Sequence, residues 1–358
     1  MPQIADTLDE LTAEWFTEAL REGGTLAPDT SVTSAASRFI GTGQLGSVAL
    51  AELEYDAPGG PSTLIIKQPS RDDGSRQVGV AVGVYEAEVR FYQDIAPLVG
   101  VTAPRMHWGA VEPETGRFTL VLDDLSQSAT VGDMVAGGTV EQAALALSQL
   151  VELQAPCWND PQLLEHTWLA DLGRTEMLFA GVEPAIGLFT ERFGDRLESE
   201  QLSLIQRLAP KAATVPSLFW KAPMTVAHGD YRLDNMMFGT APGAPPLAII
   251  DWQATRLGPP LLDAAIFLGS CLDTEDRRAN QDELLRGYHD ALCDRGVKDF
   301  SFEDCLHSLR HSSFYPLLIV ASMSVTLEQT ERGDAMWARL ARGCADLALD
   351  LDAADLLD

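Results

Sequence analysis

The segment 226–252 constrains the fold and the chemistry of this chain more than any other part of the sequence. An apolar run leads into His228 and Asp230, and Asn235 follows Asp230 by five positions. A second apolar run ends on Asp251. Two strand ends and a short loop would therefore deliver two carboxylates and an amide to one place. Such a set suits phosphate transfer, in which one carboxylate lies beside an attacking hydroxyl while an amide and another carboxylate hold a hard divalent cation.

Each of these residues also has an ordinary structural explanation. Asp230, Asp234 and Asn235 could be turn and capping residues between two strands, and Asp251 could simply end a strand. A metal-hydrolase site is less favoured, because no further histidine lies at ligand spacing near His228. The ordered set, rather than any single residue, supports the functional interpretation.

The composition indicates a large, acidic and reduced protein. With 358 residues, 46% of them hydrophobic, the chain can bury a core sufficient for two lobes or domains. The formal net charge of −28 makes nucleic acid and anionic membranes poor partners. The five cysteines are scattered without a CxxC pair, so neither a disulfide framework nor a zinc site is predicted.

No targeting or membrane segment is predicted, and we therefore expect a cytoplasmic protein. The amino-terminal segment lacks the basic flank and apolar core of a signal peptide. The longest apolar run, Phe314–Leu327, falls short of the ~20 residues that a membrane span needs. We interpret this run as a buried helix.

A glycine-rich turn lies near the start of a segment rich in strand-forming residues. Residues 41–48 read G-T-G-Q-L-G-S-V, and a β-branched run ending in Lys67 follows a Pro/Gly turn. A dinucleotide-binding fold would place a helix directly after the glycines and an acidic residue about 20 positions on, which this sequence does not do. A kinase glycine-rich loop is followed by a strand and then a lysine-bearing strand, as here. An ordinary glycine-rich hairpin is the third possibility.

A helix predicted over residues 81–95 carries Glu88 in its middle, after a predicted loop over residues 70–79. Taken alone, Glu88 fits a solvated helix position. If the helix packs on the preceding strand, however, Glu88 could pair with Lys67 and aim the ammonium group at phosphate oxygens.

The predicted secondary structure changes from mainly strands to mainly helices near residue 126. Two strands joined by a Pro/Gly turn are predicted over residues 105–111 and 118–123, after which the chain leaves the sheet. Helical patterns dominate the remainder, over residues 139–154, 263–272, 281–295, 302–331 and 334–357. We therefore predict an α+β, bilobal fold with a small β-rich N-lobe, residues 1–126, and a larger, mostly helical C-lobe, residues 127–358.

The order of these motifs resembles the aminoglycoside phosphotransferase and choline kinase superfamily, which shares the protein-kinase-like fold. The motifs are G-T-G-Q-L-G, L-I-I-K, E-V-R-F-Y, L-V-L-D-D-L, H-G-D-Y-R-L-D-N and I-D-W-Q, and they extend over about residues 35–275. The H-G-D…N and I-D-W motifs are specific, whereas the glycine loop alone is not. Within the superfamily, the chain is most similar to ecdysteroid-kinase-like and related bacterial small-molecule phosphotransferases.

The resemblance implies an O-phosphotransferase that depends on ATP and Mg²⁺ and acts on a hydroxyl of a small molecule. Asp230 would be the catalytic carboxylate that accepts or orients the hydroxyl proton. Asn235 and Asp251 would hold Mg²⁺, and Lys67, paired with Glu88, would contact the α- and β-phosphates. The other implied residues are Gly41, Gly43 and Gly46, whose backbone approaches the phosphates, the backbone of Asp123, Asp124 and Leu125, which meets the adenine, and His228 and Asp263, which support the catalytic loop.

The sequence departs from a protein kinase in three places. Gly229 replaces the arginine of the kinase H-R-D motif, and D-W-Q replaces D-F-G. Only eleven residues separate Asp251 from Asp263, too few for an activation segment, so a protein substrate is not expected. A further departure from the superfamily is Gln154, which stands where an L-H-A-x-x-W motif usually has histidine.

Two other functions and several substrates remain open. A kinase-like pseudoenzyme or ligand-binding module would bind without catalysis, and a nicotinamide dehydrogenase could be built on the glycine-rich turn. The acceptor could be an aminoglycoside, an acyl-CoA-linked hydroxy acid, or an apolar alcohol such as a sterol or polyketide, which the resemblance slightly favours. Aromatic residues between positions 156 and 224 could line a cleft for it, although such residues more often form core. No oligomeric state is predicted.

Overall fold

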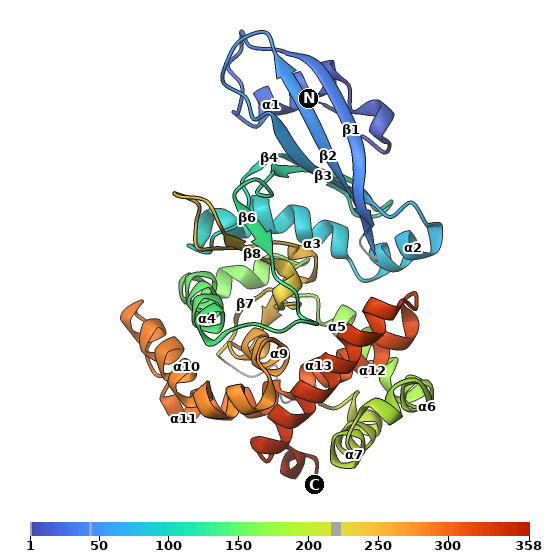
Figure 1. Cartoon of the computed structure of the whole chain (residues 1–358), viewed down its shortest axis with the longest axis vertical. Coiled ribbons are helices and arrows are strands. Elements are labelled where there is room, and N and C mark those ends of the chain that lie inside the picture. The colour runs from blue at the N-terminus through green and yellow to red at the C-terminus, as the bar shows by residue number, and fades with distance from the viewer. Residues whose placement is uncertain (1, 43–44, 216–222) are drawn as a thin grey trace.

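The computed structural model describes residues 2–42, 45–215 and 223–358. Figure 1 shows two lobes stacked along the long axis, with the amino terminus in a sheet-bearing lobe and the carboxy terminus in a helical lobe. The predicted α+β, bilobal architecture is confirmed.

The N-lobe is built on a five-stranded antiparallel sheet in the order β1-β2-β3-β5-β4. Its strands are β1 (Val32–Thr42), β2 (Gly46–Tyr55), β3 (Thr63–Pro69), β4 (Met106–Glu112) and β5 (Arg117–Asp123). Burial alternates along β2 and β3, as expected for strands whose two faces differ. Helix α1 (Ala13–Glu22) covers one face and buries Phe16 in the same cluster as Trp108 and Val121.

Helix α2 (Asp73–Ala81) shows that the predicted loop over residues 70–79 was wrong. The segment contains two glycines and two aspartates, which have low helix propensity. The carboxylate of Asp72 nevertheless caps the helix by accepting a hydrogen bond from the backbone N–H of Ser75 at 2.8 Å. The predicted helix over residues 81–95 is α3 (Val84–Arg90), which continues as a π-helical turn over Phe91–Ile95.

The chain enters the C-lobe directly after β5. The short strand β6 (Ala129–Val131) pairs with β8 (Met236–Gly239), which pairs with β9 (Leu247–Ile249). A second small sheet joins β7 (Thr225–Ala227) to β10 (Arg256–Gly258). These two sheets hold both ends of the loops 228–235 and 250–255, which carry four of the predicted site residues: His228, Asp230, Asn235 and Asp251.

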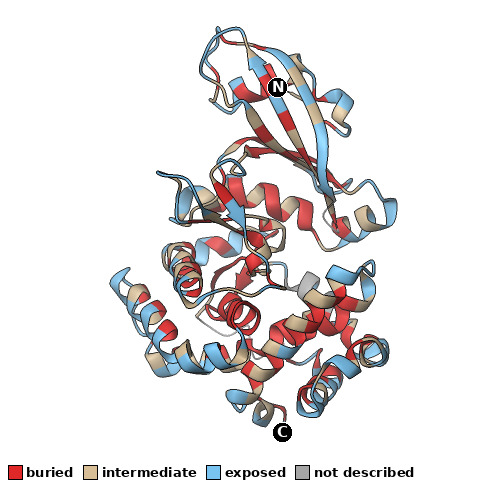
Figure 2. Ribbon diagram, in the orientation of Figure 1, coloured by how far each residue is buried: buried red, intermediate tan, exposed pale blue. Residues whose placement is uncertain are grey.

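Helix α9 lies at the centre of the C-lobe, and all of its residues are buried (Figure 2). Helix α4 (Val140–Gln154) begins with a capping box between Thr139 and Gln142, while the predicted helix over residues 302–331 is two helices. The described helices of the lobe are α4 (Val140–Gln154), α5 (Leu172–Ala180), α6 (Val182–Phe193), α7 (Ser199–Leu208), α9 (Leu262–Cys271), α10 (Thr274–Asp294), α11 (Phe302–Ser312), α12 (Phe314–Thr326) and α13 (Glu331–Asp350).

The long apolar run of the sequence forms α12, which is largely buried as predicted. Ile319 and Met323 are exceptions, because they are only partly buried and lie on one side of the helix. Within the described ranges, no helix combines the length and apolarity needed to cross a membrane.

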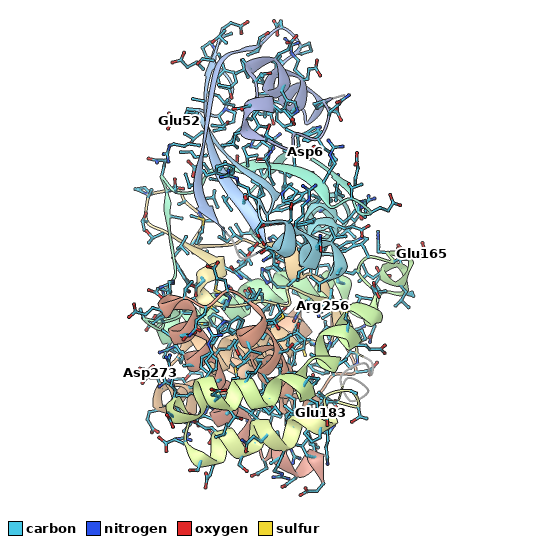
Figure 3. The ribbon with its side chains drawn as sticks, turned by 90° about the vertical axis from the view of Figure 1, so that its right-hand side faces the viewer. Asp6, Glu52, Glu165, Glu183, Arg256 and Asp273 are labelled. Atoms are coloured by element: carbon cyan, nitrogen blue, oxygen red, sulfur yellow. The ribbon has the colours of Figure 1, made fainter. Side chains whose placement is uncertain are left out.

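The acidic charge lies on the outside of both lobes. Figure 3 shows exposed carboxylates on widely separated elements: Asp6, Glu52, Glu165, Glu183 and Asp273. Such an arrangement keeps like charges apart at the surface.

Candidate active site

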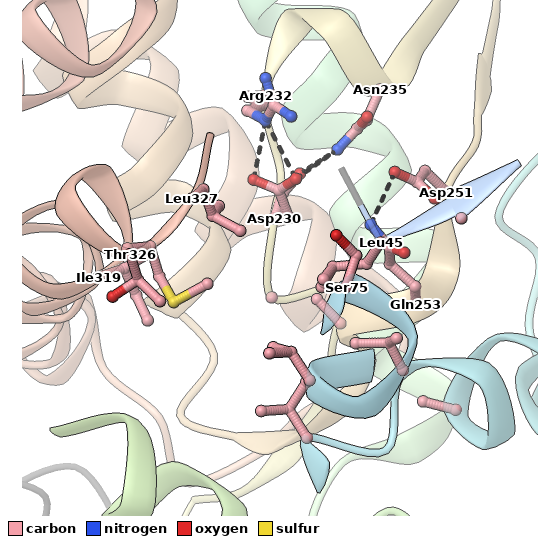
Figure 4. Close-up of a pocket in the computed structure, with 18 of the residues that line it drawn as sticks. Leu45, Ser75, Asp230, Arg232, Asn235, Asp251, Gln253, Ile319, Thr326 and Leu327 are labelled. Carbon is pink, nitrogen blue, oxygen red and sulfur yellow. Dashed lines mark hydrogen bonds and ion pairs between the residues drawn. The ribbon is translucent and has the colours of Figure 1, made fainter. Parts of the chain in front are cut away.

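A cleft of about 1240 Å³ lies between the lobes (Figure 4). Gly46 lines it from the N-lobe, and Asp230, Asn235 and Asp251 line it from the C-lobe. The two loops held by the small C-lobe sheets therefore open into the space beneath the five-stranded sheet.

Lys67 lies beside this cleft between two carboxylates, one of which, Asp251, lines it. It comes from β3, where it is the cross-strand neighbour of Val48 on β2. Its ammonium group donates to the buried carboxylate of Glu88 on α3 and, at 2.7 Å, to Oδ1 of Asp251. The structure thus brings Lys67 and Glu88 together and adds Asp251 from the other lobe.

Burial and charge act against each other in this group. Burial raises the pKa of Glu88 to about 7, because the ammonium of Lys67 offsets it only partly and the charge of Asp251 adds to it. Burial alone would raise the pKa of Asp251 as well, but the charge of Lys67 holds it below its ordinary value. Burial also opposes the charge on Lys67, and the two carboxylates more than offset it, so its pKa is raised. Glu88 and Asp251 share one ammonium group, and the pKa of Glu88 is raised while that of Asp251 is lowered.

The backbone at Asp251 is held in an unusual conformation. Its φ is +68°, which is rare for a residue other than glycine. The next residue, Trp252, is fully buried and stacks on Phe91 with ring centroids 3.6 Å apart and an interplanar angle of 4°. Gln253 donates to Oδ2 of Asp251 at 3.2 Å. The aromatic stack ties the loop to the π-helical turn that follows α3, and so holds Asp251 facing Lys67.

Asp230 is held by two neighbours on its own loop (Figure 4). Arg232 Nε donates to both carboxylate oxygens, at 2.9 and 3.0 Å. Asn235 Nδ2 donates to Oδ2 of Asp230 at 2.9 Å and to its backbone carbonyl at 2.8 Å. The structure therefore brings Asp230 and Asn235 together and adds Arg232, to which the sequence interpretation assigned no role. Its position inside the H-G-D-Y-R-L-D-N motif was the only available signal.

His228, Gly229 and Asp263 form the support beneath this loop. The buried carboxylate of Asp263, on α9, accepts from the backbone N–H groups of His228 at 2.7 Å and Gly229 at 2.8 Å. Burial raises the pKa of Asp263. The ring of His228 lies 3.0 Å from the carbonyl of Ile250 and so connects the two site loops.

The conformation at Gly229 explains why arginine is absent there. Its φ is +82°, and a Cβ atom would lie only 2.3 Å from the backbone oxygen of Ala254. A side chain at this position would therefore force the two site loops apart.

The predicted nucleotide end of the site is only partly defined. Gly41 is the next-to-last residue of β1, and Gly46 is the first residue of β2. Gly43 lies outside the described residues. The Asp123 carboxylate is 2.7 Å from Nε2 of His107, and Asp124 accepts from the backbone of Ser126 at 2.9 Å. The carbonyl of Leu125 accepts from Ser128 and Ala129 in a turn. Asp123, Asp124 and Leu125 are not among the described residues that line the cleft.

The comparison with known families decides the class of protein. Residues 60–300 match the model of the phosphotransferase enzyme family. The chain belongs to this family. The predicted superfamily and the predicted class, a phosphotransferase, are confirmed. The closer resemblance to ecdysteroid-kinase-like members stays a prediction.

Solved structures show the fold of this phosphotransferase. The GDP complex of aminoglycoside 2'-phosphotransferase-IIIa shares 15% identity, covers 93% of this chain and 99% of its own, and superposes with a TM-score of 0.50. Choline kinase from Cryptosporidium parvum Iowa II shares 12% identity over 89% of each chain, with a TM-score of 0.48. A microcompartment-associated aminopropanol kinase shares 14% identity over 96% of this chain and 99% of its own, with a TM-score of 0.45. No curated protein sequence gives a significant match.

Gln154 of the phosphotransferase has a defined structural role. It is fully buried at the end of α4, where its amide donates to the carbonyl of Pro260 at 2.8 Å and accepts from the hydroxyl of Tyr288 at 2.6 Å. Glutamine therefore satisfies one donor and one acceptor at a position where histidine was expected. Gln154 thus links α4 to α10 and to the segment before α9, and it is not among the described residues that line the cleft.

The described aromatic residues between positions 156 and 224 contribute mostly to the core, whereas Phe219 and Trp220 lie outside the described residues. Phe179, Phe189 and Phe193 are essentially inaccessible, whereas Trp168 lines the cleft. The cleft obtains its apolar lining from other elements, chiefly α12 and α13.

Proposed function

We propose that this phosphotransferase transfers the γ-phosphoryl group of ATP, bound with Mg²⁺, to a hydroxyl of a small molecule. The observation that carries the proposal is the convergence of five side chains from both lobes: three line one cleft, and two meet them beside it. Lys67 and Glu88 come from the N-lobe, and Asp251 meets them from the C-lobe. Asp230 and Asn235 share the facing loop. Phosphoryl transfer requires mainly positioning and charge neutralisation, which such a set supplies.

The donor set fits a magnesium ion. Magnesium takes oxygen ligands and retains several of its waters. The amide nitrogen of Asn235 donates to Asp230, so its carbonyl oxygen would coordinate the ion together with the carboxylate of Asp251. Bound there, the ion would neutralise charge on the nucleotide phosphates.

Lys67, aimed by Glu88, would contact the α- and β-phosphates. A chain with a net charge of −28 repels ATP at long range, so a local positive site is needed. We propose that the lobes, residues 1–126 and 127–358, enclose the nucleotide between them. The further contacts would be backbone amides of Gly41, Gly43 and Gly46 to the phosphates, and the backbone of Asp123, Asp124 and Leu125 to the adenine.

Asp230 would accept the proton of the acceptor hydroxyl as its oxygen attacks the γ-phosphorus. The bond from that phosphorus to the oxygen bridging the β- and γ-phosphates breaks, ADP leaves, and a phosphate ester forms. Arg232 would orient the carboxylate. His228 and Asp263 would hold the loop in position.

The test is transfer from ATP to an alcohol by the purified protein with Mg²⁺. We expect ADP and a phosphate ester with at least one member of a panel of amino sugars, choline, macrolides, steroid alcohols and hydroxyacyl thioesters. Asp230→Asn should lower kcat by ~10²–10⁴-fold, because the proton acceptor is lost. Its affinity for MgADP, measured by calorimetry, should stay within about twofold of the wild type, since Asp230 does not hold the nucleotide. Asp29→Asn, at an exposed position, is the control; full turnover by Asp230→Asn would refute the assignment.

A ligand-binding module without catalysis is the second candidate, and the bidentate contact between Arg232 and Asp230 favours it. Both carboxylate oxygens accept from Arg232, so an acceptor hydroxyl would have to compete with the guanidinium for them. If the wild type binds MgADP but transfers no phosphoryl group to any alcohol of the panel, the binding module replaces the enzyme as the better description.

A further inference from the structure

Beyond Asp230, the floor of the cleft is apolar. Ile319, Met323 and Leu327 follow one another at helical spacing along one side of α12 and line the cleft while remaining partly exposed. Figure 4 shows Ile319, Thr326 and Leu327 beside the space in front of Asp230. Met336 on α13 continues this surface. We call Ile319, Met323, Leu327 and Met336 the apolar floor.

The wall formed by α2 carries apolar side chains beside polar ones such as Ser75. Val78 of α2 and Val82, directly after that helix, line the same cleft. The side chain of Val78 is 36% exposed, and the helix that carries it is absent from the sequence prediction. Apolar groups that face one another across open space are typical of a ligand site.

Carboxylates at this end of the cleft already have partners. Asp234 accepts from Arg332 at 2.8 Å and lies 3.6 Å from Arg232, which also holds Asp230. Arg256 lies over the ring of Tyr315. The lining carboxylates further out cap helices or lie at the rim: Asp72 caps α2, Asp171 caps α5, and Glu328 is exposed. A polycationic acceptor is best bound by unpaired carboxylates close to the reacting hydroxyl, and there Asp230 and Asp234 are already matched by arginine.

We infer that the acceptor is an alcohol with an uncharged, apolar body, which packs between α2 and the apolar floor and presents its hydroxyl to Asp230. This inference rests on the proposed function and specifies its substrate class. A cavity of about 1240 Å³ has room for a nucleotide together with a second ligand, because single-ligand pockets typically measure about 300–1,000 Å³. The apolar floor provides the area, and Asp230 provides a polar contact that fixes the orientation of the hydroxyl.

Binding of a homologous series tests the inference independently of turnover. Calorimetry with the full chain and saturating MgADP would use 1-butanol, 1-hexanol, 1-octanol and testosterone as probes, with kanamycin and choline as cationic alternatives. We expect affinity for the linear alcohols to rise by roughly two- to fourfold per added CH₂, and testosterone to bind more tightly than either cation. Tighter binding of kanamycin or choline, or no dependence on chain length, would overturn the inference.

Variants of the apolar floor locate the binding. Met323→Glu should weaken 1-octanol and testosterone binding by roughly 10–100-fold, because a charge would face the apolar body. Met323→Leu should bind as the wild type does, and Met177→Glu, at an exposed position on α5, serves as the matched control. Unchanged binding in Met323→Glu would overturn the inference.

The two proposals fail in different ways. If the protein transfers phosphate to kanamycin or choline and does not bind the apolar alcohols, the proposed function stands and the inferred substrate class is wrong. If it binds the apolar alcohols in the predicted order but neither binds MgADP nor transfers phosphate, the proposed function is wrong and the apolar site stands.

Discussion

The ammonium group of Lys67 lies 2.7 Å from the carboxylate of Asp251, a residue 184 positions further along the chain. Glu88 contacts the same ammonium from α3. One cation therefore links the sheet and a helix of the N-lobe to a loop of the C-lobe. Since this loop lies in the cleft, changes to the group should affect ligand binding and stability together.

Replacement of Lys67 tests its role toward the nucleotide. Lys67→Met should weaken MgADP binding by roughly 10-fold or more and lower kcat, because the phosphates lose their lysine and two carboxylates face them without it. Calorimetric titration with MgADP measures the effect. Lys298→Met, at an exposed position, should bind as the wild type does. Equal affinity of Lys67→Met and the wild type would contradict the assignment.

Glu88 should make the stability of the protein depend on pH. Burial raises its pKa from 4.5 to about 7 in the folded state, so the folded protein binds this proton more tightly than the unfolded chain. The resulting stabilisation is present at low pH and is lost as the pH rises toward about 7. The free energy of unfolding in urea should therefore fall between about pH 5 and pH 7.5 by more in the wild type than in Glu88→Gln. Parallel pH dependences would show that Glu88 is ionised throughout this range.

The turn at Gly229 should tolerate no side chain. Gly229→Ala combines an unfavourable positive φ with a close approach to Ala254, whereas Gly243 has φ +84° and no atom within 4 Å of the place that a Cβ would occupy. We expect Gly243→Ala to cost about 1 kcal/mol of unfolding free energy and Gly229→Ala ~3 kcal/mol or more, with a loss of kcat. Urea unfolding and steady-state kinetics measure both. Similar costs for the two variants would mean that the loops separate easily.

Asp263 should be required for the shape of the catalytic loop. Asp263→Ala would leave the backbone N–H groups of His228 and Gly229 buried without their acceptor, at a cost of about 2–4 kcal/mol. Asp263→Asn retains one acceptor oxygen and should lose less. Thermal unfolding followed by circular dichroism distinguishes the two, with the exposed position in Asp282→Ala as the control. If Asp263→Asn is as unstable as Asp263→Ala, the charge rather than the hydrogen bonds stabilises the loop.

The strands and most helices could be predicted because their signals are local. Alternating burial along β2 and β3, and the capping box at Thr139, depend on residues close together in sequence. Helix α2 could not, because the glycines and aspartates of its segment lower its propensity and its cap at Asp72 has no periodic apolar run behind it. Because its local preference is weak, contacts with the rest of the fold decide the conformation of such a segment.

By itself, the sequence determined the class of protein: the order of the glycine loop, the Lys67 strand, Asp230, Asn235 and Asp251 was sufficient to indicate a phosphotransferase. Only the tertiary structure decided that Lys67 meets Asp251, that Arg232 holds Asp230, and that α2 and α12 line the same cleft. The physical reason is the distance along the chain over which each kind of interaction acts. Propensities, caps and turns act over a few residues, whereas ion pairs and cavities depend on where distant segments come to rest.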